Sequence, residues 1–176
     1  YRNPAMILAD GAIGQMMEKV VLPPFKPRRT EEEIRKECPW ATTGRFGGRK
    51  PNIITSLELR SEEMEIINLR IQEKYKKIEE SEVRFEEYML DDAEYAIVAF
   101  GSAARIAKKS IEIARSQGIK VGLLRPITLW PFPTKEVQKL GEKMKGILSL
   151  EINAGQMVED IRLAVAGRVP VQHFGR

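Results

Sequence analysis

Cysteine and histidine are nearly absent from this chain: Cys38 and His173 are the single examples of each among 176 residues. One cysteine excludes an internal disulfide, which is compatible with a reducing, cytoplasmic environment. One cysteine and one histidine cannot supply the four ligands of a structural zinc site or an iron–sulfur cluster. We therefore predict no metal site on this chain alone, and any cluster would need ligands from a partner.

Long apolar runs and a charge of one sign are also lacking. No run of about 18 or more apolar residues occurs and no signal-peptide pattern opens the chain, so we expect no membrane contact and no secretion signal. Charged residues make up 31% of the chain, yet the net charge is only +4. The densest basic segments, 26–29 and 45–50, contain one aromatic residue, which argues against a nucleic-acid partner. The hydrophobic content of 43% is enough for a packed core.

In the first half of the chain, the pattern of apolar and charged residues changes from segment to segment. An apolar run at 5–9 predicts a buried strand, and residues 13–20 predict a short helix. Residues 23–56 collect prolines and glycines without periodicity, which predicts a long connector. Residues 61–89 carry apolar residues at helical spacing among many charges, so we expect a long charged helix, with a break at Ser81 left open.

From residue 91 onward, apolar strands alternate with amphipathic helices. We predict strands at 95–100, 119–124, 147–152 and 169–173, and helices at 103–115, 134–145 and 155–166. Apolar strands that alternate with helices imply a parallel sheet covered on both faces and joined by right-handed crossovers. The predicted fold class is α/β, with a three-layer parallel sheet.

Ligands in open parallel sheets gather at the carboxyl ends of the strands. Gly101, Ser102 and Ala103 follow one predicted strand and open a helix, so their backbone N–H groups are a candidate anion site, with Arg125 as a nearby charge. The alternative is that Ser102 only caps its helix and Gly101 only makes a tight turn. The loop lacks the G-x-G-x-x-G spacing of a dinucleotide fingerprint, which favours this alternative.

A proline-rich corner follows the second predicted strand of the alternating region. Prolines fix the backbone around Trp130 and Phe132, so these rings either fill the hydrophobic core or form part of a subunit interface. Glu151 and Asn153 leave the next strand as polar groups and are further interface candidates. No nucleophile with an adjacent base can be assembled, and His173 on a predicted strand reads as structural, so we assign no catalytic residue.

Several of these segments carry a family resemblance. Tyr95–Arg105 and Leu124–Pro133 resemble the transketolase C-terminal-type domain of 2-oxoacid:ferredoxin oxidoreductase α subunits, particularly the branched-chain (2-oxoisovalerate) type. Further segments are similar to the same subunit: Asn3–Gly11 with Gly14–Glu18, Ser81–Tyr88, and Leu150–Gln156. The resemblance therefore covers nearly the whole chain.

The resemblance implies a division into three parts. Residues 1–22 would be the tail of an upstream pyrimidine-binding-type domain, and residues 23–91 a connector with the long charged helix. Residues 92–176 would be a transketolase C-terminal-like α/β domain, which we expect to be incomplete at its C-terminus. On this view both ends of the chain are cut, and the chain by itself is inert.

The resemblance also implies an activity for the assembled enzyme. Such enzymes use thiamine diphosphate, Mg²⁺ and iron–sulfur clusters to convert a 2-oxoacid and CoA to an acyl-CoA, and they pass electrons to ferredoxin. The implied partners are a β subunit carrying thiamine diphosphate and further oxidoreductase subunits. A 2-oxoglutarate-specific α subunit is the runner-up. Two readings outside this class stay open: a phosphate- or nucleotide-binding module, and a structural interaction domain.

Overall fold

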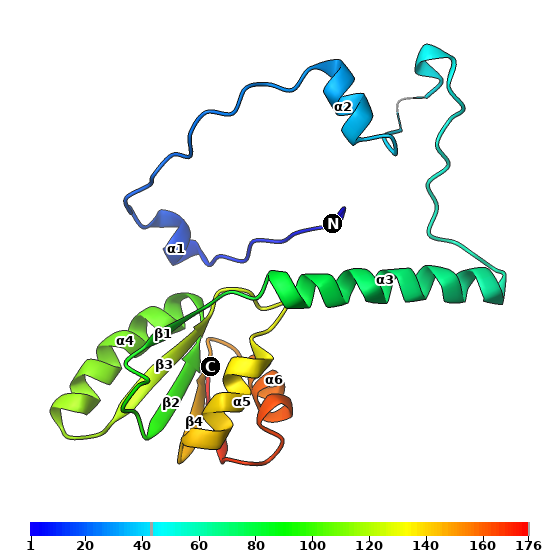
Figure 1. Ribbon diagram of the computed structural model, residues 1–176. Coiled ribbons are helices and arrows are strands. Elements are labelled where there is room, and N and C mark those ends of the chain that lie inside the picture. Colours follow the sequence, from blue (N-terminus) through cyan, green and yellow to red (C-terminus); the bar gives the residue numbers. More distant parts are fainter. Residues whose placement is uncertain (43, 176) are drawn as a thin grey trace. The chain divides into compact units, whose positions relative to one another are not determined.

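The computed structural model describes residues 1–42 and 44–175 (Figure 1). The chain divides into two compact units, one formed by Tyr1–Met16 with Gln72–Arg176 and the other by Met17–Ile71. Helix α3 (Ser61–Ser81) crosses the boundary between the two units along the chain. The first unit contains the sheet and most of the buried apolar side chains.

A five-stranded sheet organises the first unit, in the order β1-β3-β2-β4-β5. The strands are β1 (Phe85–Tyr88), β2 (Tyr95–Ala99), β3 (Val121–Pro126), β4 (Gly146–Leu150) and β5 (Val171–Phe174). Strands β3, β2, β4 and β5 are parallel, whereas β1 pairs with β3 in the antiparallel direction. The chain therefore moves from β2 to one neighbour, β3, and then crosses to the other neighbour, β4.

Three helices cover the two faces of the sheet: α4 (Gly101–Ser116), α5 (Thr134–Lys143) and α6 (Met157–Val165). Figure 1 shows α4 on one side of the strands and α5 with α6 on the other. Because side chains alternate along a strand, Val98 of β2 packs with the α5 and α6 side, and Ala99 packs with α4. The predicted fold class, α/β with a three-layer parallel sheet, is confirmed for strands β2 to β5, whereas the antiparallel edge strand β1 was not predicted.

The helical prediction for 61–89 was wrong at its end. Helix α3 stops at Ser81, and residues 85–88 form strand β1 instead. Glu86 lies opposite Arg125 in the register with β3, and Phe85 and Glu87 are exposed while Glu86 and Tyr88 are half-buried. A short edge strand with charged residues has little apolar signal, so its pairing with β3 decides its conformation.

The strand expected at 5–9 is also absent from the described residues. This segment is extended but pairs with no described strand, and Met6 and Ile7 are 82% and 95% exposed. A β-strand needs a neighbour for its backbone hydrogen bonds, which an apolar run alone cannot supply. The helix expected at 13–20 is shortened to α1 (Gly11–Gln15), with Asp10 as its N-cap.

The second unit contains more structure than a plain connector. Helix α2 (Glu31–Glu37) begins at a capping box, in which Thr30 and Glu33 bond each other's backbone N–H groups. A single 3₁₀ turn, η1 (Phe46–Gly48), follows. The T-x-x-E signature was readable in the sequence, but the prolines around it led us to expect no helix here.

Candidate functional site

The carboxyl ends of β2 and β4 lie side by side, because these two strands are neighbours in the sheet. The helix after β2 is α4 and the helix after β4 is α6, and they cover opposite faces. Helices that leave in opposite directions open a crevice between the two strand ends, which is where α/β sheets bind ligands. The topology therefore makes the turn at Gly101 and the loop after Leu150 the candidate site.

The turn after β2 is joined to the N-terminal segment. Gly101 has φ +55°, a left-handed backbone conformation that favours glycine, and it starts α4 without a side-chain cap. The Ser102 hydroxyl donates a hydrogen bond of 2.5 Å to the Asp10 carboxylate, so Ser102 does not cap its own helix. This hydrogen bond, followed by the amide of Ile13, holds the pKa of Asp10 below its ordinary value. Ala103 is buried in the core under α4.

Arg125 lies on β3 and has a carboxylate partner of its own. Its guanidinium donates to Glu86 of β1 at 2.8 Å, and Lys108 of α4 donates to the other oxygen of Glu86 at 2.5 Å. These two donors, Lys108 first, hold the pKa of Glu86 below its ordinary value. The predicted anion-site residues are therefore divided: Ser102 bonds Asp10, and Arg125 bonds Glu86.

Glu151 follows β4 and is a buried carboxylate at the start of α6. None of its side chain is exposed, and it accepts hydrogen bonds from the backbone N–H groups of Met157 and Val158, both at 2.9 Å. The Ser149 hydroxyl donates a further bond of 2.7 Å, and the amide of Gln156 one of 3.1 Å. Burial alone would raise the pKa of Glu151, but these hydrogen bonds outweigh it and lower the pKa below its ordinary value.

This burial changes the interpretation of the predicted interface pair. A carboxylate with no exposed surface cannot contact a partner in this conformation, so the Glu151 side chain forms its hydrogen bonds inside the domain instead. Asn153 is half-buried and its side-chain oxygen accepts a bond of 2.7 Å from the amide of Gly155, which shapes the loop. Asn153 thus orders the turn that carries Glu151 to α6.

His173 on β5 packs against this loop. Its Nε2 lies 3.9 Å from the nearer oxygen of Glu151 and has no hydrogen-bond partner among the described residues. A Cβ added at Gly155 would lie 3.6 Å from this ring, and one at Gly175 would lie 2.6 Å from it. The Nε2 atom of His173 is therefore buried beside this loop, while 21% of the side chain remains exposed.

The proline-rich corner separates its two aromatic rings. Trp130 is 53% exposed and forms an edge-to-face contact with Tyr75 of α3, with ring centroids 5.4 Å apart. Phe132 is half-buried and packs against the core beside α5 and α6. Thr128 fixes the corner: its hydroxyl donates to Pro131 O at 2.8 Å and accepts from Arg84 N at 3.0 Å. Trp130 is therefore the more exposed of the two rings.

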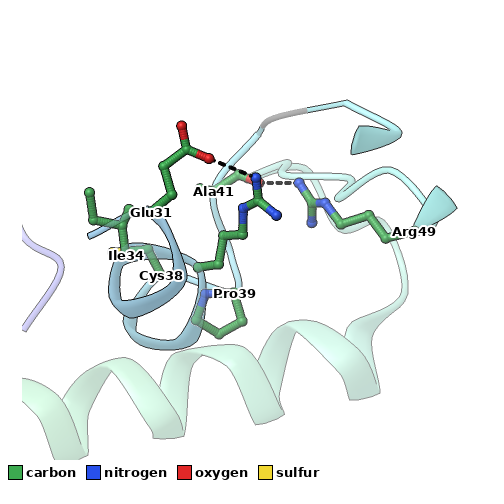
Figure 2. Close-up of a pocket in the computed structure, with 7 residues that line it drawn as sticks. Glu31, Ile34, Cys38, Pro39, Ala41 and Arg49 are labelled. Atoms are coloured by element: carbon green, nitrogen blue, oxygen red, sulfur yellow. Dashed lines mark hydrogen bonds and ion pairs between the residues drawn. The ribbon is translucent and has the colours of Figure 1, made fainter. Parts of the chain in front are cut away.

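A cavity of about 510 Å³ lies within the second unit (Figure 2). It is lined by Glu31, Ile34, Arg35, Cys38, Pro39, Ala41 and Arg49. Arg35 pairs with Glu31 at 2.9 Å. Figure 2 shows the contact between Arg49 and Ala41, in which the guanidinium donates to the backbone oxygen at 2.6 Å. The polar groups of this cavity thus mainly stabilise the fold of the second unit.

The chemistry of the donor set limits cofactor binding. Within residues 1–42 and 44–175, no group of three or more His, Cys, Asp or Glu side chains is placed to hold a metal ion. A chain with one cysteine does not fit an iron–sulfur cluster. Over the same residues, no helix has the length and apolar content needed to cross a membrane.

The structure is therefore a mostly parallel α/β domain whose sheet is covered by helices on both faces. Residues 93–176 match the family model of the pyruvate:ferredoxin oxidoreductase core domain II. Ketoisovalerate oxidoreductase subunit VorB from Methanothermobacter marburgensis is 48% identical over 164 residues, which are 93% of this chain and 45% of that protein. The 2-oxoglutarate synthase subunit KorA from Archaeoglobus fulgidus is 29% identical over 178 residues, 99% of this chain and 49% of that protein.

A solved structure has the same fold. The 2-oxoglutarate:ferredoxin oxidoreductase from Magnetococcus marinus, with 2-oxoglutarate, coenzyme A and succinyl-CoA bound, aligns with a TM-score of 0.63 at 18% identity. The alignment covers 74% of this chain and 24% of that chain. The chain is similar in sequence to subunits of 2-oxoacid oxidoreductases, which confirms the resemblance found in its segments. It spans about half the length of the curated relatives described here.

Proposed function

We propose that this chain is part of the α subunit of a thiamine-diphosphate-dependent 2-oxoacid:ferredoxin oxidoreductase. The assembled enzyme would oxidatively decarboxylate a branched-chain 2-oxoacid such as 2-oxoisovalerate, form the acyl-CoA and pass the electrons to ferredoxin. The observation that carries this proposal is the 48% identity to a ketoisovalerate oxidoreductase subunit over 93% of the chain. The cytoplasm is the proposed location.

The substrate assignment rests on the difference between two groups of relatives. Identity to the A. fulgidus 2-oxoglutarate synthase subunit is 29%, well below the 48% for the ketoisovalerate subunit. We therefore favour a branched-chain substrate and keep 2-oxoglutarate as the alternative.

This part of the subunit would have a structural role in the enzyme. Cys38 and His173 are too few to ligate iron–sulfur clusters, so other subunits would hold the clusters. The family resemblance implies that thiamine diphosphate and Mg²⁺ would also be held with other subunits or domains. The partners would include a β subunit carrying thiamine diphosphate. The described residues would supply a rigid α/β domain and, at Trp130, an exposed aromatic ring of the kind enriched at interfaces.

The proposal also includes the domain division at residues 22 and 91. Residues 1–22 would end an upstream pyrimidine-binding-type domain, 23–91 would connect it, and 92–176 would form the transketolase C-terminal-like domain. The family-model match at 93–176 supports the last boundary.

The experiment is an assay of the protein purified natively and anaerobically from its source. Mass spectrometry would identify the co-purifying chains, and CoA-dependent reduction of a viologen dye would be followed with 2-oxoisovalerate, 2-oxoglutarate and pyruvate. We expect partner subunits and the fastest turnover with 2-oxoisovalerate. Preference for 2-oxoglutarate would select the alternative substrate, and a lone protein without turnover on any 2-oxoacid would refute the enzyme assignment.

A further inference from the structure

The cavity of the second unit combines an apolar surface with two positive charges. Its volume of about 510 Å³ falls within the range of about 300–1,000 Å³ that is usual for small-ligand pockets. Ile34, Pro39 and Ala41 supply apolar atoms, and Arg35 and Arg49 supply guanidinium groups. All five residues belong to Met17–Ile71, so the cavity is a feature of one compact unit.

One wall of the cavity is fixed by hydrogen bonds to two backbone carbonyl groups. Arg49 donates to Ala41 O at 2.6 Å, and the Asn52 side-chain amide donates to the same oxygen at 3.0 Å and to Pro39 O at 2.8 Å. Figure 2 shows the Arg49 side chain pointing toward Ala41. The contacts that stabilise this part of the fold therefore also hold the cavity wall in place, and a preorganised wall lowers the entropy cost of binding.

Arg49 brings a positive charge to this wall. The group that accepts its bond, Ala41 O, is neutral, so this contact does not cancel the charge of the guanidinium. Arg49 is half-buried, and charges interact more strongly where water is partly excluded. A guanidinium also matches the geometry of carboxylate and phosphate groups, which it binds through two parallel N–H bonds. Arg49 is therefore suited to hold an anion.

Arg35 of α2 has a carboxylate partner that a ligand can replace. It pairs with Glu31 at 2.9 Å, but the two side chains are 55% and 84% exposed. Exposed pairs with this i,i+4 spacing are screened by solvent and contribute little to stability. An anion in the cavity can take the place of Glu31 at Arg35, while the Glu31 carboxylate turns to solvent at small cost.

The charge of the surrounding segment favours an anion as well. Residues 26–50 contain eight Lys and Arg residues and four Glu residues, so they carry the whole net charge of +4 of the chain. A local excess of one sign raises the concentration of ligands of the opposite sign near the surface. The field around the cavity thus attracts anions and repels cations.

We propose that this cavity binds a small organic anion. Arg35 and Arg49 would hold its carboxylate or phosphate group, and its apolar body would lie against Ile34 and Pro39. The charged group supplies selectivity, so a neutral molecule of the same shape binds less tightly. The apolar body supplies part of the affinity, so a bare inorganic anion also binds less tightly. This inference does not depend on the proposed activity.

The test uses Cys38, which is half-buried, lines the cavity and is the single cysteine of this chain. Occupation of the cavity should slow alkylation of its thiol by iodoacetamide, measured by mass spectrometry of the Cys38 peptide. The sample is the purified protein with the subunits that accompany it. The probes are phenyl phosphate, phenylacetate, benzyl alcohol and inorganic phosphate, each at millimolar concentration. We expect protection by phenyl phosphate, phenylacetate or both, and little by benzyl alcohol or inorganic phosphate.

A pair of variants then tests the arginine. Arg35→Gln should raise the half-protecting concentration of the organic anion about tenfold, the effect of losing one hydrogen bond to a charged group. Lys36→Gln is the matched control, because it removes the same charge from the next residue of α2, which is not among the described lining residues. Protection in this control should stay close to that of the unmodified protein.

Each other result would overturn the proposal. Absence of protection by both organic anions, or a Cys38 thiol that does not react at all, would mean that the cavity is not an accessible site. Equal protection by benzyl alcohol would remove the selectivity for charge, and equal protection by inorganic phosphate would remove the apolar contact. Equal weakening in Arg35→Gln and Lys36→Gln would indicate general attraction to a basic surface. The comparison of probes uses the unmodified protein, so it decides the question even if a variant does not fold.

Discussion

The Glu151 carboxylate accepts a hydrogen bond of 2.9 Å from the backbone N–H of Met157, so the residue that ends β4 also caps the helix that follows the loop. The four backbone N–H groups at the start of a helix have no partner within it. Here one buried carboxylate satisfies three successive amides and a buried hydroxyl. The loop between β4 and α6 is therefore fixed by its first residue.

The first prediction is that Glu151→Ala lowers the free energy of unfolding by about 3 kcal/mol, because it removes a helix cap and leaves buried donors without an acceptor. Urea denaturation followed by circular dichroism measures this loss. Glu159→Gln is the control, since Glu159 is an exposed carboxylate in the first turn of the same helix. Equal midpoints for the two variants would contradict the capping role.

The second prediction concerns acid. The pKa of Glu151 is lowered in the folded protein from the ordinary value of 4.5, so its charge stabilises the fold above that value. This contribution is lost as the pH falls through the folded pKa. Comparison of the unmodified protein with Glu151→Gln by urea denaturation should show a stability difference near neutral pH that shrinks below about pH 4.5. A difference independent of pH would refute this explanation.

The strands that the sequence predicted well are the fully buried ones. The strand that includes Val98 is apolar on both sides because helices cover both faces of the sheet. Such a strand can be predicted from its own sequence without knowledge of its neighbours. Strand β1 was missed because its conformation depends on the pairing of Glu86 with Arg125, 39 residues away along the chain. Edge pairings of this kind leave little local signal.

The candidate site shows the same limit. The topology of alternating strands and helices predicted which strand ends meet at the carboxyl edge, and Ser102 at the start of α4 and Glu151 directly after β4 do lie there. The sequence did not indicate the partners of these side chains. Asp10 is 92 residues from Ser102, and the three consecutive amides bound by Glu151 converge on one acceptor only when α6 forms. Side-chain pairing across such separations comes from tertiary structure.

The third prediction is that Gly122→Ala in β3 destabilises the domain by about 3 kcal/mol through overpacking. A Cβ at this position would lie 2.4 Å from the backbone oxygen of Met89, which also accepts a bond of 2.7 Å from Arg115 and so has little freedom to move. Gly14→Ala in α1 is the control, with nothing within 4 Å of the added carbon. Urea midpoints that coincide for both variants would contradict the close approach.

The fourth prediction tests Trp130 as an interface residue. Since the ring is 53% exposed and its described aromatic contact is with Tyr75, Trp130→Ala should cost the isolated fold no more than about 1 kcal/mol. Loss of a large aromatic side chain from an interface weakens association much more than that. Sedimentation velocity of the native complex should therefore show dissociation in Trp130→Ala at concentrations where the unmodified complex is intact. Leu163→Ala, at an 81% exposed position on α6, should assemble normally, and normal assembly of Trp130→Ala would remove this ring from the interface.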